Sequence, residues 1–409
     1  MKLLIRFLPM ALLLFLTVLA LSQDKEYTKR SKNEVRKGPG TFYPLLYVLP
    51  EGIQVQTLKK EDGWLNIEVI GGNQNVADEW MPKTCLTDAP KSGDKNKQFD
   101  ISSPNASPSS LAAAIRGFAV RFGQTSGTAI DSLSRLDRYF FPPEEYNAFK
   151  SEDQNLRQSF DDSQPAMVQG FDQTDSSECA FGLNVASRVA ATGLIRDRAS
   201  NEYLNLLITY IAEAAGAYDF QFKGYIIQGP RLTAVGLPGG YIFITQPLID
   251  SCNDEAQLAG ILAHEMTHVL LKHGIEEVHK RVKQAQADEV FEDLARKTGR
   301  ANDSTDARLN DIAQMGYDEA VKPRLLKYEL AADQGAVEIL TRIGYDPQAV
   351  AEMVLKIRNA AGEGTTVYDF NPAMKRDFQE RYDALEKNLK SRQPGGERNR
   401  ARFARMFGR

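Results

Sequence analysis

One short motif constrains this chain more than any other feature. The pattern His-Glu-x-x-His occupies residues 264–268, inside a segment, 253–272, that is predicted to be a helix. Residues four apart on a helix share a face, so the imidazoles of His264 and His268 can bind one small cation together. Glu265 then lies beside any water that the cation holds. This arrangement is typical of zinc hydrolases.

Two histidines do not complete such a site, because catalytic zinc usually takes three protein ligands and one water. A second predicted helix, Leu325 to Ile343, offers the third ligand. Glu329 and Asp333 share a face of this helix. Glu329 can bind the metal, while Asp333 accepts a hydrogen bond from the second nitrogen of a ligand histidine. We therefore predict one Zn²⁺ per chain.

The bulk composition is that of a globular protein with two or three domains. The chain has 409 residues and a formal net charge of −4. The basic surplus of nucleic-acid binders is absent, so no nucleic-acid partner is expected. The three cysteines, Cys85, Cys179 and Cys252, allow at most one internal disulfide, and each is expected to be a small buried residue.

The first 22 residues have the grammar of a secretory signal peptide. Lys2 and Arg6 precede an apolar run, Phe7 to Leu21, and cleavage is predicted near Ser22. The alternative is an uncleaved anchor, but a run of about 15 residues is shorter than the roughly 20 that span a bilayer. We expect a mature protein that is exported, to the bacterial periplasm, the cell envelope or the extracellular space, and that has no transmembrane segment.

Residues 28–90 alternate short β-rich runs with turns and predict a small all-β domain. The segment resembles a bacterial SH3-like domain through four motifs: Val35-Arg36-Lys37-Gly38-Pro39-Gly40-Thr41, Leu49-Pro50-Glu51-Gly52, Asp62-Gly63-Trp64 and Glu79-Trp80-Met81. The resemblance implies a cell-wall peptide or a protein as its ligand. The aromatic residues equally fit the core of a small barrel.

The rest of the chain divides by composition. A polar linker is predicted at 91–110, a helical lead-in at 111–178, the metal-binding domain at 179–390 and a basic, disordered tail at 391–409. The charged insertion 274–323 is hypothesised to cover the cleft as a lid. His273 lies off the ligand face of its helix and is expected to be structural or exposed, as is His279.

The C-terminal half resembles the HtpX and CAAX-prenyl-protease family of zinc metalloendopeptidases, from about Val185 to Leu385. The matching motifs, in order, are Leu237-Pro238-Gly239-Gly240-Tyr241-Ile242-Phe243, Ala259 to His268 with His273, Glu329-Leu330-Ala331-Ala332-Asp333 and Gly344-Tyr345-Asp346-Pro347. The resemblance implies an α+β fold, with a mainly helical zincin-type domain and a small sheet. HtpX-type members carry membrane helices, so this chain looks like a soluble, exported branch.

The resemblance also implies roles for the residues at these positions. Zinc is bound by His264, His268 and Glu329, and Glu265 is the catalytic base. The strand around Thr233 and Ala234, where the family commonly has Asn at position 233, pairs with the substrate backbone. The turn at Gly239 and Gly240 lies close to substrate, although the pair is first of all a turn requirement.

One departure from the family pattern concerns the C-terminal helix. The family often has a His followed six residues later by an Arg, and the two assist the transition state. Arg381 fits the Arg, but Lys375 stands at the His position. Either Lys375 takes the donor role, or zinc and Arg381 suffice. Arg381 is equally compatible with an ion-pair role.

These features predict an endopeptidase that acts on extended or unfolded proteins. Zinc lowers the pKa of its water, Glu265 takes the proton, and substrate adds as a strand along residues 233–235. One alternative is a cell-wall peptide hydrolase delivered by the SH3-like domain. Another is a binding or chaperone-like module with a structural metal, which would need four protein ligands and no Glu265.

Overall fold

The chain divides into two compact units, Met1–Pro39 with Pro44–Asn105, and Gly40–Tyr43 with Ala106–Arg409. The computed structural model describes residues 25–30, 33–72, 78–88, 141–157, 160, 182, 185–190, 193–218, 220–274, 276, 324–360, 372–393 and 395–408. The predicted leader and linker lie outside these ranges, as do nearly all of the insertion, most of the lead-in, Cys179 and His279.

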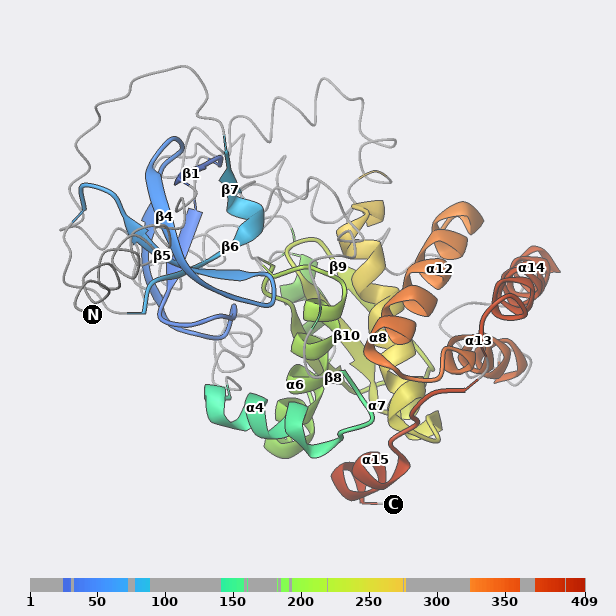
Figure 1. Cartoon of the computed structure of the whole chain (residues 1–409). Coiled ribbons are helices and arrows are strands. Elements are labelled where there is room, and N and C mark those ends of the chain that lie inside the picture. Colours follow the sequence, from blue (N-terminus) through green and yellow to red (C-terminus); the bar gives the residue numbers. More distant parts are fainter. Residues whose placement is uncertain are drawn as a thin grey trace, which may run out of the picture. The chain divides into compact units, whose positions relative to one another are not determined.

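The first unit is a seven-stranded sheet in which every pair is antiparallel. Its strands are β1 (Lys25–Thr28), β2 (Asn33–Arg36), β3 (Leu45–Leu49), β4 (Gln54–Glu61), β5 (Trp64–Val69), β6 (Trp80–Pro82) and β7 (Leu86–Thr87), with a 3₁₀ turn, η1, at Lys83–Cys85 (Figure 1). The spatial order is β3-β2-β6-β5-β4-β1-β7. The predicted all-β character of this segment is confirmed.

The core of the first unit comes from the apolar face of these strands. Val35, Leu49 and Met81 are fully buried. Trp64 and Trp80 are only 2% and 6% exposed, so both tryptophans are core residues. Of the two interpretations of these aromatic residues, the structure favours the core.

The second unit is mainly helical and carries a small sheet. Its elements are α4 (Pro143–Glu152), α6 (Arg198–Ala214), β8 (Lys223–Ile227), β9 (Ala234–Leu237), β10 (Tyr241–Thr245), α7 (Gln246–Ser251), α8 (Glu255–Leu270), α12 (Leu326–Ile343), α13 (Gln348–Ala360), α14 (Pro372–Leu389) and α15 (Arg400–Phe407). A sheet-rich first unit and a mainly helical second one make the described chain α+β, as predicted.

The three-stranded sheet has the order β8-β10-β9. β10 is parallel to β8 and antiparallel to β9, and the tight turn after Leu237 allows the second pairing. Gly239 and Gly240 have φ of 79° and 85°, a conformation that favours glycine. A Cβ on Gly240 would also lie 2.5 Å from the ring of Phe220. The turn requirement inferred for the glycine pair is therefore supported.

Helix α8 is the centre of the second unit and contacts α6, α12, α13, β9 and β10 (Figure 1). Asp254 caps it by accepting the N–H of Gln257 over 3.0 Å, as an aspartate at this position commonly does. Fifteen of its 16 residues are buried. A helix that is surrounded on all sides holds its side chains in fixed positions, which suits it to carry a site.

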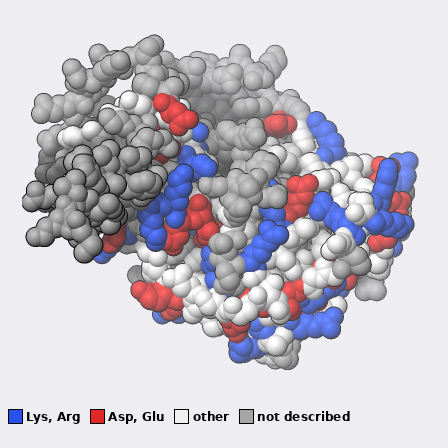
Figure 2. Space-filling view, viewed as in Figure 1, with Lys and Arg blue, Asp and Glu red and all other residues white. Residues whose placement is uncertain are grey.

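Helix α12 lies along α8 and ends as predicted at Gly344, whose φ of 102° is the left-handed cap of many helices (Figure 1). None of the helices in the described ranges combines the length and the hydrophobicity that a membrane span requires. Cys85 and Cys252 are buried, as expected of small core residues. On the face of the second unit visible in Figure 2, Lys and Arg side chains are interspersed with Asp and Glu.

The predicted disordered tail is wrong for residues 395–408. This segment includes α15, and Arg402 within it is 3% exposed. Arg402 binds Glu255, the first residue of α8, and Arg398 donates to Asp346 and to Glu352. Acidic partners far away in sequence hold these arginines, and one of them, Glu255, is fully buried. No local pattern shows such partners.

Candidate metal centre

Two imidazoles converge on one face of α8. His264 and His268 lie one helical turn apart, and their Nε2 atoms are 3.1 Å from each other. The side chain of His264 is 13% exposed and that of His268 is 1% exposed. The pair therefore sits at the bottom of an opening, with both second nitrogens turned into the protein.

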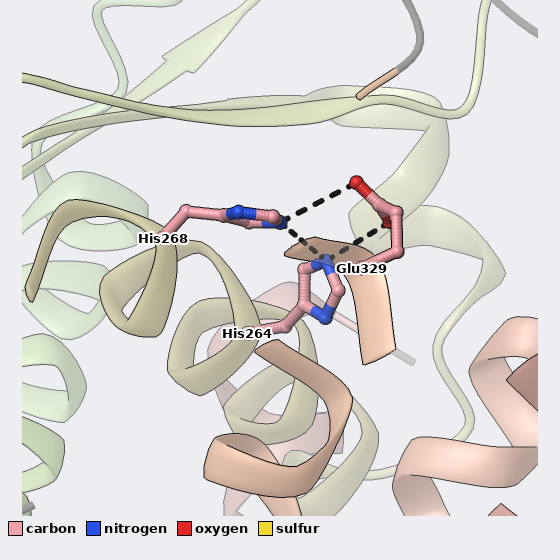
Figure 3. A group of neighbouring side chains, drawn as sticks. All are labelled: His264, His268 and Glu329. Carbon is pink, nitrogen blue, oxygen red and sulfur yellow. Dashed lines mark hydrogen bonds and ion pairs between the residues drawn. The ribbon is translucent and has the colours of Figure 1, made fainter. Parts of the chain in front are cut away.

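Helix α12 brings a carboxylate to the same point. Oε2 of Glu329 lies 3.5 Å from Nε2 of His264, and Oε1 lies 3.5 Å from Nε2 of His268 (Figure 3). The ligand atoms of the three residues all lie within 4.8 Å of one another. The structure thus brings together the three residues that the sequence predicted as ligands, from two helices that pack side by side.

The spacing of these atoms can be compared with what zinc requires. In a tetrahedral site with bonds of about 2.0–2.1 Å, neighbouring ligand atoms are about 3.3–3.4 Å apart. The observed separations of 3.1 and 3.5 Å bracket that value. Two imidazoles and one carboxylate are also a donor set that hydrolytic zinc sites use. The residues present therefore fit a zinc ion.

Asp333 and Arg381 support two of the three donors. Nδ1 of His264 lies 2.9 Å from Oδ1 of Asp333, where the carboxylate can accept its proton. Arg381, from α14, donates to both oxygens of Asp333 over 2.8 Å and lies 2.6 Å from Oε2 of Glu329. Arg381 consequently orients both carboxylates. Lys375, the residue at the position of the family His, is exposed and does not line the cavity.

The surroundings set the protonation of the donors. Burial disfavours a charged His264, but hydrogen bonds with Asp333 and Glu329 outweigh it and raise its pKa to about 9. Burial lowers the pKa of His268 well below its usual value. Burial acts to raise the pKa of Glu329, yet the charge of Arg381 holds that pKa well below the ordinary range. The surroundings that favour a proton on His264 equally favour a metal cation.

Glu265 points toward the edge strand of the small sheet. Its Oε2 accepts the N–H of Gly236 over 2.7 Å, and the carbonyl of Gly236 accepts Nη2 of Arg324 over 3.1 Å. A Cβ on Gly236 would lie 2.4 Å from the carbonyl oxygen of Glu265. No sequence pattern indicates Gly236 or Arg324, because these contacts join segments that are distant in the chain.

The outer edge of β9 has a defined register. Thr233 donates its N–H to Oγ1 of Thr245 over 3.2 Å and accepts the N–H of Thr245 over 3.0 Å, so its backbone faces β10. Backbone groups alternate sides along a strand, so those of Ala234 and Gly236 face outward. The groups of Gly236 are already bonded. Of the two residues predicted to pair with substrate, the geometry thus suits Ala234 and not Thr233.

β9 also begins one residue later than the strand predicted along residues 233–235. Before this strand, the side-chain hydroxyl of Thr245 takes the place of a backbone donor in the ladder, because it donates to the carbonyl of Arg231 over 2.7 Å. The regular strand starts at Ala234.

A cavity of about 150 Å³ opens beside the three donors. Its polar lining, besides the donors, includes Thr233, Glu265, Arg324, Asp333, Asp377 and Arg381. The rest of its lining is largely apolar and includes Leu232, Ala234, Val235, Leu248, Ile261, Leu326, Val350, Met353, Val354, Ile357 and Phe378. Gly239 and Gly240 do not line it. The arrangement joins a polar centre to an apolar recess.

Of the two roles expected of His273, structural or exposed, the structure supports the structural one. His273 is 5% exposed, and its Nδ1 lies 2.8 Å from Nδ1 of His268. Burial lowers its pKa to about 4. Helical spacing puts His273 off the ligand face, but the helix ends at Leu270 and Lys272 adopts a left-handed φ of 56°. That turn brings the ring back beneath the site.

Several known proteins that resemble this chain are named as proteases. The family model described as "Peptidase family M48" matches residues 198–394, which include all three donor residues. The mitochondrial metalloendopeptidase OMA1 of Schizosaccharomyces pombe is 30% identical over 76 residues, 19% of this chain and 23% of that protein.

Two bacterial proteins named beta-barrel assembly-enhancing protease are also similar. The Yersinia pestis protein is 24% identical over 183 residues, 44% of this chain and 37% of that protein. The Escherichia coli (strain K12) protein is 23% identical over 168 residues, 41% of this chain and 34% of that protein. The chain therefore spans well under half the length of these relatives.

Proposed function

The chain belongs to peptidase family M48, a family of zinc metallopeptidases, and we propose that it is an exported zinc-dependent endopeptidase that cleaves extended segments of proteins. The observation that carries this proposal is the convergence of His264, His268 and Glu329 with Glu265 beside them. We infer a zincin-type domain, in which the motif helix α8 lies under the edge strand β9.

His264, His268 and Glu329 would hold the metal. Bound zinc would supply a water of lowered pKa and would polarise the peptide carbonyl. Glu265 takes the proton of the attacking water and passes it to the leaving amine. The N–H of Gly236, bonded to Oε2 of Glu265, keeps this carboxylate in a fixed orientation. Because the base is already oriented, little of the activation free energy is needed to reorient it during the reaction.

Arg381 has a positioning role in this proposal. Its guanidinium bonds Asp333 through two nitrogens and lies 2.6 Å from Glu329. Asp333 in turn orients His264. Arg381 also lines the cavity, so a substrate carbonyl could reach it there. Lys375 is not needed for this arrangement.

The substrate backbone is proposed to add as a strand at Ala234. The outward N–H and C=O of this residue can form one pair of ladder bonds with an extended peptide. The pairing ends at Gly236, because Glu265 and Arg324 bond its outward groups. Recognition through the backbone gives weak sequence preference, and extended or unfolded proteins meet this requirement best.

The apolar recess adds a side-chain preference. Val350, Met353, Val354 and Ile357 form one face of α13 and line the cavity next to the donors. An apolar substrate side chain near the scissile bond would gain about 25 cal/mol for each Å² it buries there. We therefore propose that cleavage occurs beside apolar residues.

Export and the ligand of the first unit are separate proposals. The basic and apolar pattern of residues 1–22 supports secretion. The antiparallel sheet of the first unit supports an SH3-like domain that takes a protein or cell-wall peptide. Two relatives are named for beta-barrel assembly, which supports envelope proteins as substrates of this chain.

A structural-metal module is less well supported. Within the described part of the chain the donor group has three members, whereas structural zinc sites use four protein ligands. The carboxylate of Glu265 beside this group would also be unnecessary in such a module.

The test compares wild type with Glu265→Gln on unfolded, casein-like protein and on purified cell-wall peptides. Each reaction is run with and without a chelator, and zinc content is measured for both proteins. We expect wild type to cleave the unfolded protein, chelator to stop it, and Glu265→Gln to retain zinc with at least about a 100-fold lower rate.

The outcomes separate the candidate functions. Cleavage of cell-wall peptides alone would replace the proposal with the cell-wall hydrolase. Retained zinc with no activity on either substrate would favour the structural-metal module. Equal activity of wild type and Glu265→Gln would remove Glu265 from the chemistry.

A further inference from the structure

The tautomer of His268 has to be set by a neighbour. A neutral imidazole that binds a metal through Nε2 carries its proton on Nδ1. His268 is 2% exposed, so water does not reach this proton freely. A buried donor without an acceptor costs about 1–3 kcal/mol. His264 solves the same problem with Asp333, and His268 needs a different acceptor.

The structure offers His273 as that acceptor. The two Nδ1 atoms are 2.8 Å apart, and the rings meet edge to face with centroids 5.0 Å apart and an interplanar angle of 71°. Two nitrogens at this distance share one proton. If His268 binds metal through Nε2, that proton belongs to His268, and Nδ1 of His273 accepts it.

The ring of His273 is itself held in place. Tyr328 stacks on it with centroids 4.3 Å apart and an interplanar angle of 28°. The hydroxyl of Tyr328 donates to Glu276 over 2.7 Å. Tyr328 directly precedes the ligand Glu329, so the same turn of α12 supplies a ligand and the support for His273. The left-handed backbone of Lys272 turns the chain so that His273 reaches this position.

We propose that His273 is a positioning residue of the metal centre, which accepts the Nδ1 proton of His268 and thereby keeps Nε2 of His268 oriented and free to bind zinc. The proposal rests on the proposed function, because it concerns the same metal. It gives the two histidine ligands unlike partners, a carboxylate for His264 and a neutral imidazole for His268. A partner of this kind commonly contributes 10- to 100-fold to metal affinity.

Two substitutions separate the acceptor from the ring. His273→Phe keeps a ring against Tyr328 but has no acceptor. His273→Asn loses the ring but keeps an oxygen near the position of Nδ1. Zinc affinity is measured by competition with a chromophoric chelator, and circular dichroism of the metal-free proteins checks the fold. We expect about 10- to 100-fold weaker zinc binding for His273→Phe, and affinity within about threefold of wild type for His273→Asn.

A measurement on the wild type covers the case in which His273→Phe does not fold. The chain has four histidines, so ¹⁵N spectra of histidine-labelled protein are simple enough to assign. With zinc bound, we expect the proton on Nδ1 of His268 and an unprotonated Nδ1 on His273.

Three results would overturn the proposal: wild-type zinc affinity in a folded His273→Phe, an equal loss in folded His273→Asn and His273→Phe, or a protonated Nδ1 on His273 in the zinc-bound protein. These results are distinct from failure of the proposed function. If wild type binds no zinc or cleaves no protein, the function fails. If wild type does both while His273→Phe binds zinc equally well, only the role of His273 fails.

Discussion

Replacing Arg402 by Ala should destabilise the second unit strongly, although Arg402 lies 147 residues along the chain from its partner Glu255. Its Nε and Nη2 donate to the two oxygens of Glu255 over 2.7 and 2.5 Å, and its Nη1 donates to the carbonyl of Phe149 over 2.9 Å. Its guanidinium also lies 4.1 Å from the centroid of the Phe149 ring. Glu255 is fully buried at the start of α8.

The magnitude follows from what the substitution leaves behind. Removing one partner of a buried ion pair costs about 3–5 kcal/mol, because the other charge stays in the interior without compensation. Glu255 keeps hydrogen bonds from Tyr203, Tyr345 and Asn399. These donors place the expected cost near the lower limit, about 3 kcal/mol. For a unit of this size that corresponds to a Tm lower by about 6–12 °C.

The assay is urea unfolding at neutral pH with excess chelator, so that metal binding does not enter the free energy of unfolding. Arg400→Ala is the matched control. The side chain of Arg400 is 74% exposed, and its Nε lies 3.8 Å from Asp254, so its loss should cost under about 0.5 kcal/mol. Hydrogen exchange in residues 395–408 shows whether α15 detaches first.

The reasoning fails if Arg402→Ala and Arg400→Ala have the same stability within error. It also fails if Arg402→Ala lowers the free energy of unfolding by less than about 1 kcal/mol while hydrogen exchange in α15 stays slow. Either result would mean that the interior already compensates the charge of Glu255 and that the C-terminal arginine contributes little.

Three further outcomes are expected. Gly236→Val should lower kcat by roughly 10- to 100-fold at unchanged zinc content, because the new side chain would push β9 away from Glu265 and disturb the base; an unchanged kcat on unfolded protein would contradict this. Met353→Trp should fill the recess and lower kcat/KM by about tenfold or more for peptides with a large apolar residue at the cleavage site, with little change for alanine; equal effects on both peptide series would argue against a subsite there. Hydrogen bonds from Arg398 hold the pKa of Glu352 below its ordinary value of 4.5, so this carboxylate stabilises the fold above that pH and its contribution disappears as pH falls through the lower folded-state value. Between pH 5 and 3 the Tm of Glu352→Gln should therefore fall less steeply than that of wild type, and parallel curves would exclude this linkage.

The helical periodicity of the sequence was sufficient to predict which candidate ligands share a helix face. The four-residue spacing of His264 and His268 on one helix, and of Glu329 and Asp333 on another, follows from helix geometry, and the structure brings these side chains together. Caps and turns were also readable in advance. Gly344 ends α12, and the Gly239-Gly240 pair makes the turn between β9 and β10.

Other features depend on contacts between distant segments. The bond from Gly236 to Glu265 spans 29 residues and that from Arg402 to Glu255 spans 147. Neither has a local pattern, because a buried polar group takes whatever partner the packing brings to it. The composition of the C-terminal segment predicted a disordered tail, because composition does not show that this segment packs against α8. That packing makes part of the segment a helix.

Short-range sequence rules account for which side chains share a helix face, because that depends only on the rise and turn of the backbone. The position of His273 shows where such rules end. A single left-handed residue after α8 turns its ring under His268, and α12 supplies the tyrosine that holds it. Only the folding of two helices against each other decides which partner a buried nitrogen finds, since its hydrogen bond must be satisfied within the interior that the whole chain creates.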